Sequence, residues 1–221
     1  MVRLLALGLY VVAPFLLLRL HGRAGTMAAI LAIWLPIEFR LLHSVGVDPT
    51  TAIVSGMIAG VLAFRSRRDI LDVSAAFDLR KMNFRHAFLN FAMFAACGIP
   101  LALAIGFIRP AVRVPDIAGI PGLVVTILFF NALPEEILFR GIIQHVTESA
   151  LKSRVGASIV SALIFGLSHL NNEPVVPNYK YFVMATLAGV FYGNAWRRDR
   201  NVFTSTITHT LVNTGWRLFF R

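Results

Sequence analysis

The stretch that decides the fold is residues 117–146, IAGIPGLVVTILFFNALPEEILFRGIIQHV. It is long and mostly apolar, but Glu135, Glu136 and Arg140 interrupt its second half. A membrane-spanning helix needs about 20 mostly apolar residues, so this run predicts a helix that carries charge at membrane depth. Ionisable groups are costly in a bilayer and usually mark a functional site there.

The composition of the whole chain agrees with a membrane environment. Hydrophobic residues make up 57% of the 221 residues, charged residues make up 14%, and the mean hydropathy is +0.72. A soluble domain carries about 25% charged residues, so the composition argues against a water-soluble enzyme, a disordered protein and a coiled coil. The net charge of +10 raises the question of nucleic acid. The basic residues lie in short clusters between apolar runs, so we expect no nucleic-acid partner.

Seven further apolar runs accompany this stretch, and they predict an all-α, polytopic membrane protein with about eight transmembrane helices around an intramembrane polar site. The eight ranges are about 2–18, 24–42, 50–64, 88–108, 117–146, 155–170, 179–196 and 202–220. We expect one domain over residues 1–221, with the motif-bearing catalytic core at about 117–221. Glycines four residues apart, at Gly56 and Gly60 and at Gly189 and Gly193, predict close helix packing.

The positive charges predict the orientation. Most basic residues fall in alternate connections, at 19–23, 65–85, 152–154 and 197–200. Connections rich in Lys and Arg face the cytoplasm, so both termini should be non-cytoplasmic, with the chain in the inner or plasma membrane of the cell. The 65–85 connection mixes acidic and apolar residues, which leaves an amphipathic segment in the headgroup region and a solvated loop as open alternatives.

The charged residues of the 117–146 run have a spacing that assigns them different partners. Glu136 and Arg140 are four residues apart, so they share a helix face and should form an ion pair. Glu135 is rotated by about 100° from Glu136 and suits a general base, while Pro134 should loosen the backbone bonding just before the pair. Asn131, one turn before Glu135, could add a hydrogen bond. A purely structural salt-bridge network is the alternative.

Two later runs carry further polar residues at helical spacing. His169 follows Phe165 by four residues, and Asn213 follows His209 by four, so each pair should lie on one side of its helix. Together with Glu135 they supply a base, two imidazoles and an amide donor. These groups can activate water and stabilise an oxyanion.

The three motifs Glu135-Glu136-x-x-x-Arg140, Phe165-x-x-x-His169 and His209-x-x-x-Asn213 resemble the signature motifs of the CPBP (Abi) intramembrane proteases. That family includes the Ras-converting CAAX endopeptidase. The resemblance covers about residues 120–215, with the motifs in the family's order on separate apolar runs. It implies hydrolysis of a peptide bond within the membrane, in a membrane-associated protein or peptide substrate.

The resemblance also implies a role for each motif residue. Glu135 with His169 would activate the attacking water, and His209 with Asn213 would hold the developing oxyanion. The supporting residues would be Glu136, Arg140 and Phe165.

A metal-free glutamate mechanism is the expectation, so no cofactor is predicted. The alternative is zinc bound by Glu135, His169 and His209, a His₂Glu set of the kind found in zinc hydrolases. The sequence contains no His-Glu-x-x-His motif that would support a metalloprotease helix.

Two other classes of function compete with a protease. A small transporter or channel would use the same buried polar residues for ion passage, but such proteins often contain inverted repeats, which this sequence lacks. A catalytically silent scaffold would have lost motif residues, and none is lost. His169 should lie near the outer end of its helix, which favours a site that opens outward and a substrate anchored at that face.

Overall fold

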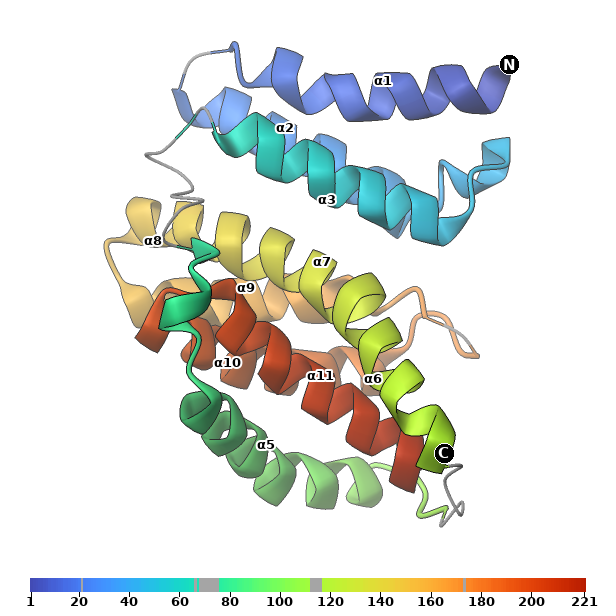
Figure 1. Ribbon diagram of the computed structural model, residues 1–221, viewed down its shortest axis with the longest axis vertical. Helices are drawn as coiled ribbons and strands as arrows, with labels where there is room; N and C mark the ends of the chain where they lie inside the picture. Colours follow the sequence, from blue (N-terminus) through green and yellow to red (C-terminus); the bar gives the residue numbers. More distant parts are fainter. Residues whose placement is uncertain (21, 66, 68–75, 112–116, 173) are drawn as a thin grey trace. The chain divides into compact units, whose positions relative to one another are not determined.

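The computed structural model describes residues 1–20, 22–65, 67, 76–111, 117–172 and 174–221 (Figure 1). These residues are almost all helical, and none of them forms a strand beyond an isolated bridge between Pro110 and Phe220. The prediction of an all-α protein is therefore confirmed. The proposed amphipathic segment in the 65–85 connection falls largely on residues 66 and 68–75, which lie outside the described residues.

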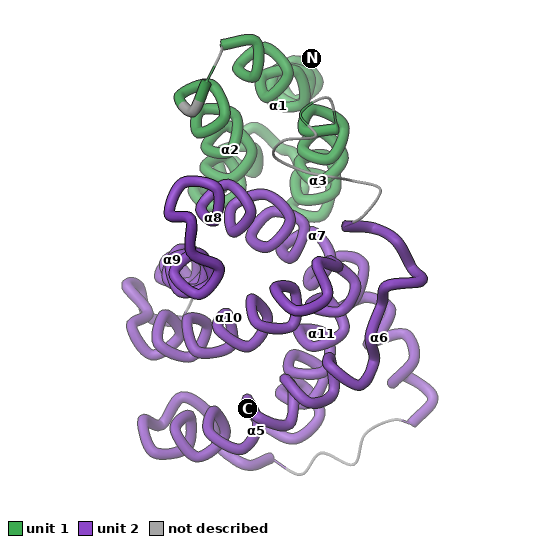
Figure 2. The backbone as a smooth tube through the Cα atoms, turned by 90° about the vertical axis from the view of Figure 1, so that its left-hand side faces the viewer, with its two compact units in different colours: residues 1–73 green, residues 74–221 purple. Residues whose placement is uncertain are grey.

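The chain divides into two compact units, residues 1–73 and 74–221 (Figure 2). Unit 1 contains α1 (Val2–Leu17), α2 (Gly22–Glu38), η1 (His43–Val45) and α3 (Pro49–Arg65). The buried Tyr10 hydroxyl donates a hydrogen bond of 3.0 Å to the Ile33 carbonyl. A Cβ atom at Gly56 would collide with that hydroxyl, so the glycine lets α3 approach α1 closely, as its spacing predicted.

Unit 2 contains four long helices and one interrupted helix. The long helices are α5 (Phe84–Ala104), α9 (Arg154–Leu167), α10 (Tyr179–Asp199) and α11 (Val202–Phe219). Helix α10 packs against α5, α9 and α11. A Cβ at Gly189 would lie 3.1 Å from the Cα of Ala162, which shows that the second predicted glycine pair also allows close packing.

The interrupted helix runs through the 117–151 region and carries the two adjacent glutamates. Its segments are η3 (Ile117–Gly119), α6 (Ile120–Ile127), η4 (Leu128–Ala132), α7 (Leu133–Glu136), η5 (Ile137–Gln144) and α8 (His145–Leu151). Segments η4 and η5 are π-helical, and the Leu133 N–H bonds to the Leu128 carbonyl, five residues back. Pro134 has no backbone N–H to donate to an α-helical hydrogen bond. Turns of π-helix are frequent at functional sites.

Four helices of unit 2 begin at a polar residue that caps them. The caps are Asn83, Ser153, Asn178 and Asn201, and each accepts a hydrogen bond from the backbone N–H three residues later. These bonds satisfy helix N–H groups that have no partner within the helix. They fix the residue at which α5, α9, α10 and α11 start. They therefore also fix the position along the helix axis of each residue that these helices carry.

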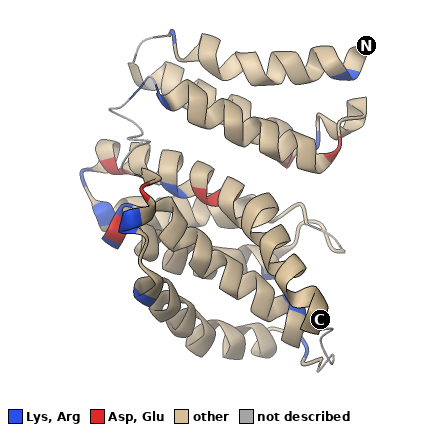
Figure 3. Cartoon of the chain, in the orientation of Figure 1, with Lys and Arg blue, Asp and Glu red and all other residues tan. Residues whose placement is uncertain are grey.

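Charged residues gather at the end of unit 2 where α10 ends and α11 begins (Figure 3). Arg200 binds both carboxylate oxygens of Glu148, at 2.6 and 2.9 Å. His86 Nδ1 lies 2.8 Å from a carboxylate oxygen of Asp199. Unit 2 contains the basic clusters at 152–154 and 197–200, and it also contains Arg80, Lys81 and Arg85 of the 65–85 cluster.

Among the described residues, two helices are long and apolar enough to cross a membrane, Phe84–Ala104 and Ile117–Leu151. The shorter apolar helices are Val2–Leu17, Ala24–Glu38, Pro49–Arg65 and Arg154–Leu167. Helices are present in all eight predicted ranges, but the count of eight membrane spans stays a prediction. The single domain over residues 1–221 also stays a prediction.

Candidate active site

The predicted ion pair between Glu136 and Arg140 is present and completely buried. Arg140 Nε lies 3.2 Å from Glu136 Oε2, and both side chains have an exposed fraction of 0%. Arg140 also donates a hydrogen bond of 3.0 Å to Ser161 Oγ on α9. Its guanidinium carbon lies 5.1 Å from the centre of the Phe165 ring, so one arginine joins the interrupted helix to α9.

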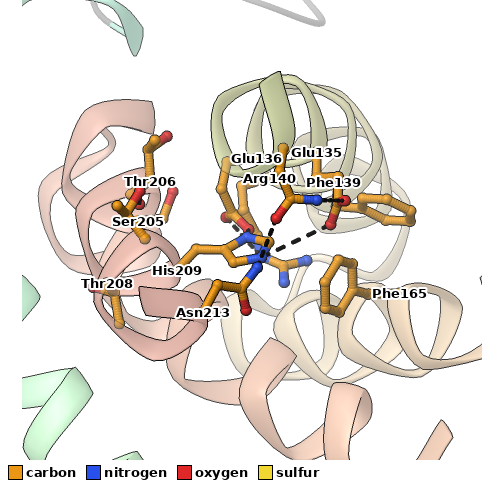
Figure 4. Close-up of polar contacts among 12 residues, drawn as sticks. Glu135, Glu136, Phe139, Arg140, Phe165, Ser205, Thr206, Thr208, His209 and Asn213 are labelled. Atoms are coloured by element: carbon orange, nitrogen blue, oxygen red, sulfur yellow. Dashed lines mark hydrogen bonds and ion pairs between the residues drawn. The ribbon is translucent and has the colours of Figure 1, made fainter. Parts of the chain in front are cut away.

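Glu136 has a second partner in His209 of α11 (Figure 4). His209 Nδ1 lies 3.0 Å from Glu136 Oε1, and His209 Nε2 lies 3.9 Å from Glu135 Oε2. A carboxylate can only accept hydrogen bonds, so Nδ1 carries a hydrogen and Nε2 faces Glu135. The imidazole stacks on the Tyr192 ring, with 4.4 Å between centroids and 15° between planes, which fixes its orientation.

Glu135 belongs to a hydrogen-bonded series of three side chains. Asn131 Nδ2 donates to Glu135 Oε1 at 2.8 Å, and Asn131 Oδ1 accepts from Asn213 Nδ2 at 2.6 Å. The Glu135 side chain is 27% exposed, against 0% for Glu136. The neighbouring acids therefore differ as predicted: Glu136 is enclosed in an ion pair, and the Glu135 side chain is partly exposed although its Oε2 atom is buried.

His169 lies just beyond the end of α9, which corrects its predicted place inside a helix over residues 155–170. Helix α9 ends at Leu167, and His169 Nδ1 lies 2.8 Å from the Phe165 carbonyl. The carbonyl accepts the Nδ1 hydrogen, so Nε2 of the neutral ring keeps its lone pair. The Phe165 ring lies 4.6 Å from the ring of His169 and 5.8 Å from that of His209, so it links the two imidazoles.

The structure adds residues that the motifs did not reveal. Ser161 lies one turn before Phe165 on α9, so the four-residue spacing places both on one face of that helix, but it gives no sign of the partnership with Arg140. Tyr192, which stacks on His209, lies between the paired glycines of α10 and carries no local sign of its role. Tyr181 of α10 contacts His169 with 4.7 Å between ring centroids and likewise has no motif.

Within the described parts of the chain, no group of three or more His, Cys, Asp or Glu residues is arranged to hold a metal ion. The zinc alternative, with Glu135, His169 and His209 as a His₂Glu set, stays a prediction, and so does the metal-free mechanism.

Comparison with known proteins agrees with the motifs. The family model described as type II CAAX prenyl endopeptidase Rce1-like matches residues 118–215, which confirms the resemblance to CPBP and CAAX proteases. No curated protein and no solved structure matches the chain. The matched segment contains every site residue described above, and the match and the apolar helices together indicate an integral membrane protein with the motifs of a protease.

Proposed function

We propose that this chain, whose residues 118–215 match the Rce1-like CAAX proteases, is an intramembrane endopeptidase. Its substrate would be a membrane-associated protein or peptide. The observation that carries the proposal is the pair of adjacent glutamates in unlike surroundings. Glu136 is fully buried between Arg140 and His209, whereas Glu135 is partly exposed with His209 Nε2 3.9 Å away. Such a division leaves one acid to organise the site and one to act as a base.

In the proposed reaction, a water molecule attacks the carbonyl carbon of the scissile bond while Glu135, assisted by His169, accepts its proton. The carbonyl oxygen becomes an oxyanion that accepts hydrogen bonds from His209 and Asn213. Protonated at both nitrogens, His209 would donate from Nδ1 to Glu136 and from Nε2 to the oxyanion. The proton held by Glu135 then passes to the amide nitrogen, the oxyanion re-forms the carbonyl, and the C–N bond breaks to give a carboxylic acid and an amine.

The test compares Glu135→Gln with Glu148→Gln, the same substitution on the same interrupted helix at its far, charged end. Both variants, purified in lipid nanodiscs, are given a membrane-anchored peptide. Loss of a positioned general base costs about 10²–10⁴-fold in rate, so Glu135→Gln should lose at least about a hundredfold in kcat. Glu148→Gln should cleave normally. Cleavage at the wild-type rate by folded Glu135→Gln would refute the proposal, and ion flux without cleavage would favour a transporter.

Zinc is tested separately, because the glutamate mechanism needs no metal. We expect dialysis against 1,10-phenanthroline, with metal content followed by mass spectrometry, to leave kcat unchanged. Loss of activity that returns with added Zn²⁺ would support the zinc mechanism instead.

The location and topology are part of the proposal. Placing the basic end of unit 2 in the cytoplasm puts the C-terminus and the α9–α10 connection, where His169 lies, on the outer face of the inner or plasma membrane. The alternating basic connections of the sequence predict the same face for the N-terminus. The site would then open outward to a substrate anchored at that face. Peptides with and without a prenyl group will show whether this chain needs the lipid that the family description names.

A further inference from the structure

Asn131 lies at the centre of the site, although none of the three motifs includes it. It occupies the π-helical segment η4, and its carboxamide meets one side chain of its own helix and one of α11. Figure 4 shows that these two partners, Glu135 and Asn213, come from separate helices. In the proposed reaction one is the base and the other is an oxyanion donor.

The two hydrogen bonds fix the orientation of all three groups. The oxygen of a carboxamide can only accept and its nitrogen only donates. Asn131 therefore turns its nitrogen to the Glu135 carboxylate, at 2.8 Å, and its oxygen to the nitrogen of Asn213, at 2.6 Å. The reverse orientation would place oxygen against carboxylate and nitrogen against nitrogen, so the pairing excludes it.

Asn213 is consequently held with its nitrogen toward the interrupted helix. One N–H is used by Asn131, and the second remains available for an oxyanion. Without Asn131, the Asn213 amide could rotate by half a turn and present its oxygen, which would repel the oxyanion. The same loss would free the Glu135 carboxylate to leave the position in which Oε2 faces His209.

We propose that Asn131 is a positioning residue that couples the base Glu135 to the oxyanion donor Asn213. The proposal rests on the proposed function. It predicts which kinetic constant changes, because correct orientation of the base and the donor stabilises the transition state more than the bound substrate. Loss of an interaction made in the transition state lowers kcat and leaves KM nearly unchanged.

The experiment measures kcat, KM and melting temperature for Asn131→Ala and Asn131→Asp, with Asn194→Ala as the matched control. Asn194 Nδ2 donates to Asn90 Oδ1 at 2.8 Å between α10 and α5, so it makes the same kind of interhelical amide bond away from the site. Removal of an oxyanion donor costs about 10²–10³-fold in kcat. Removal of Asn131, which orients such a donor, should lower kcat about tenfold or more. Asn194→Ala should lower the melting temperature and leave kcat unchanged.

Asn131→Asp keeps the size of the side chain and an acceptor for Asn213, but it replaces the donor to Glu135 with a carboxylate oxygen. It should fold and still lose kcat, which separates positioning from packing. In the Asn213→Ala background, Asn131→Ala should cost less than it does alone, because residues that act through one another are not additive.

Two failures are distinguishable. If Glu135→Gln remains fully active, the proposed function fails. If Glu135→Gln is inactive while folded Asn131→Ala and Asn131→Asp keep the wild-type kcat, or if the losses at Asn131 and Asn213 are simply additive, the role of Asn131 is refuted and the proposed function stands.

Discussion

Burial separates two chemically identical neighbours in this site. Glu136 has no exposed surface and is shared by Arg140 and His209, whereas Glu135 is 27% exposed. A buried charge is tolerated only when it is paired, so Glu136 depends on Arg140. Glu135 is partly exposed and lies outside the Glu136–Arg140 pair, and in the proposed reaction it is the residue that transfers the proton.

Removing one member of the buried pair should therefore be costly. We expect Arg140→Met to lower the free energy of unfolding by about 3 kcal/mol, since a single charge left in the interior costs about 3–5 kcal/mol. Arg140→Met combined with Glu136→Gln should recover most of that loss, because no charge remains and the glutamine oxygen still accepts from His209. Denaturant titration of the purified variants measures this, and a double variant no more stable than Arg140→Met would contradict it.

Tyr192 should act on the reaction through its ring rather than its hydroxyl. The ring stacks on His209 at 4.4 Å, and aromatic pairs contribute about 0.5–1.5 kcal/mol beyond their buried area. Tyr192→Phe should keep the wild-type kcat, whereas Tyr192→Leu should lose about three- to tenfold while KM changes little. Steady-state kinetics would decide, and equal kcat values for the two variants would show that stacking is unimportant.

At the scale of single helices, the sequence predicted which residues share a helix face. It did not predict how one helix is rotated against its neighbour. The four-residue intervals predicted the Glu136–Arg140 pair, and Pro134 predicted loosened backbone bonding. No interval within one helix could predict that His209 bonds to Glu136 through Nδ1, because that depends on how α11 is rotated against the interrupted helix. The place of His169 was missed for a related reason. The end of α9 is set by local turn bonds, such as that from Ser168 Oγ to the Phe165 carbonyl, and not by hydropathy.

The start of α3 offers a test of helix capping that does not involve the site. Thr51 donates side-chain and backbone hydrogen bonds to Asp48, and these bonds lower the pKa of that carboxyl below its ordinary value of 3.8. A folded-state pKa below the unfolded value means that the bonds stabilise the folded chain above about pH 4 and are lost as the pH falls through the folded pKa.

The melting temperature of the wild type should therefore fall more steeply than that of Asp48→Asn below pH 4. Melting curves between pH 3 and pH 7 measure the difference. Parallel curves would show that the cap contributes nothing measurable.

For the molecule as a whole, composition predicted the environment and the class of fold, because a chain with 14% charged residues cannot cover itself with a soluble surface. The division into two compact units, at residues 73 and 74, could not be read from hydropathy, since apolar runs on both sides look alike. Packing depends on which faces fit together. Charge, by contrast, made a prediction of orientation that the described contacts do not test.

That orientation can be tested at the two ends of α9. Lys152 precedes this helix, and Val175, which is 63% exposed, lies in the connection that follows His169. Because Cys97 is exposed, both reporters require a Cys97→Ser background. In intact cells, an impermeant maleimide should label Val175→Cys from outside, and Lys152→Cys only after the membrane is permeabilised. The reverse pattern would place the basic end outside the cell and turn the site, with its two imidazoles, toward the cytoplasm.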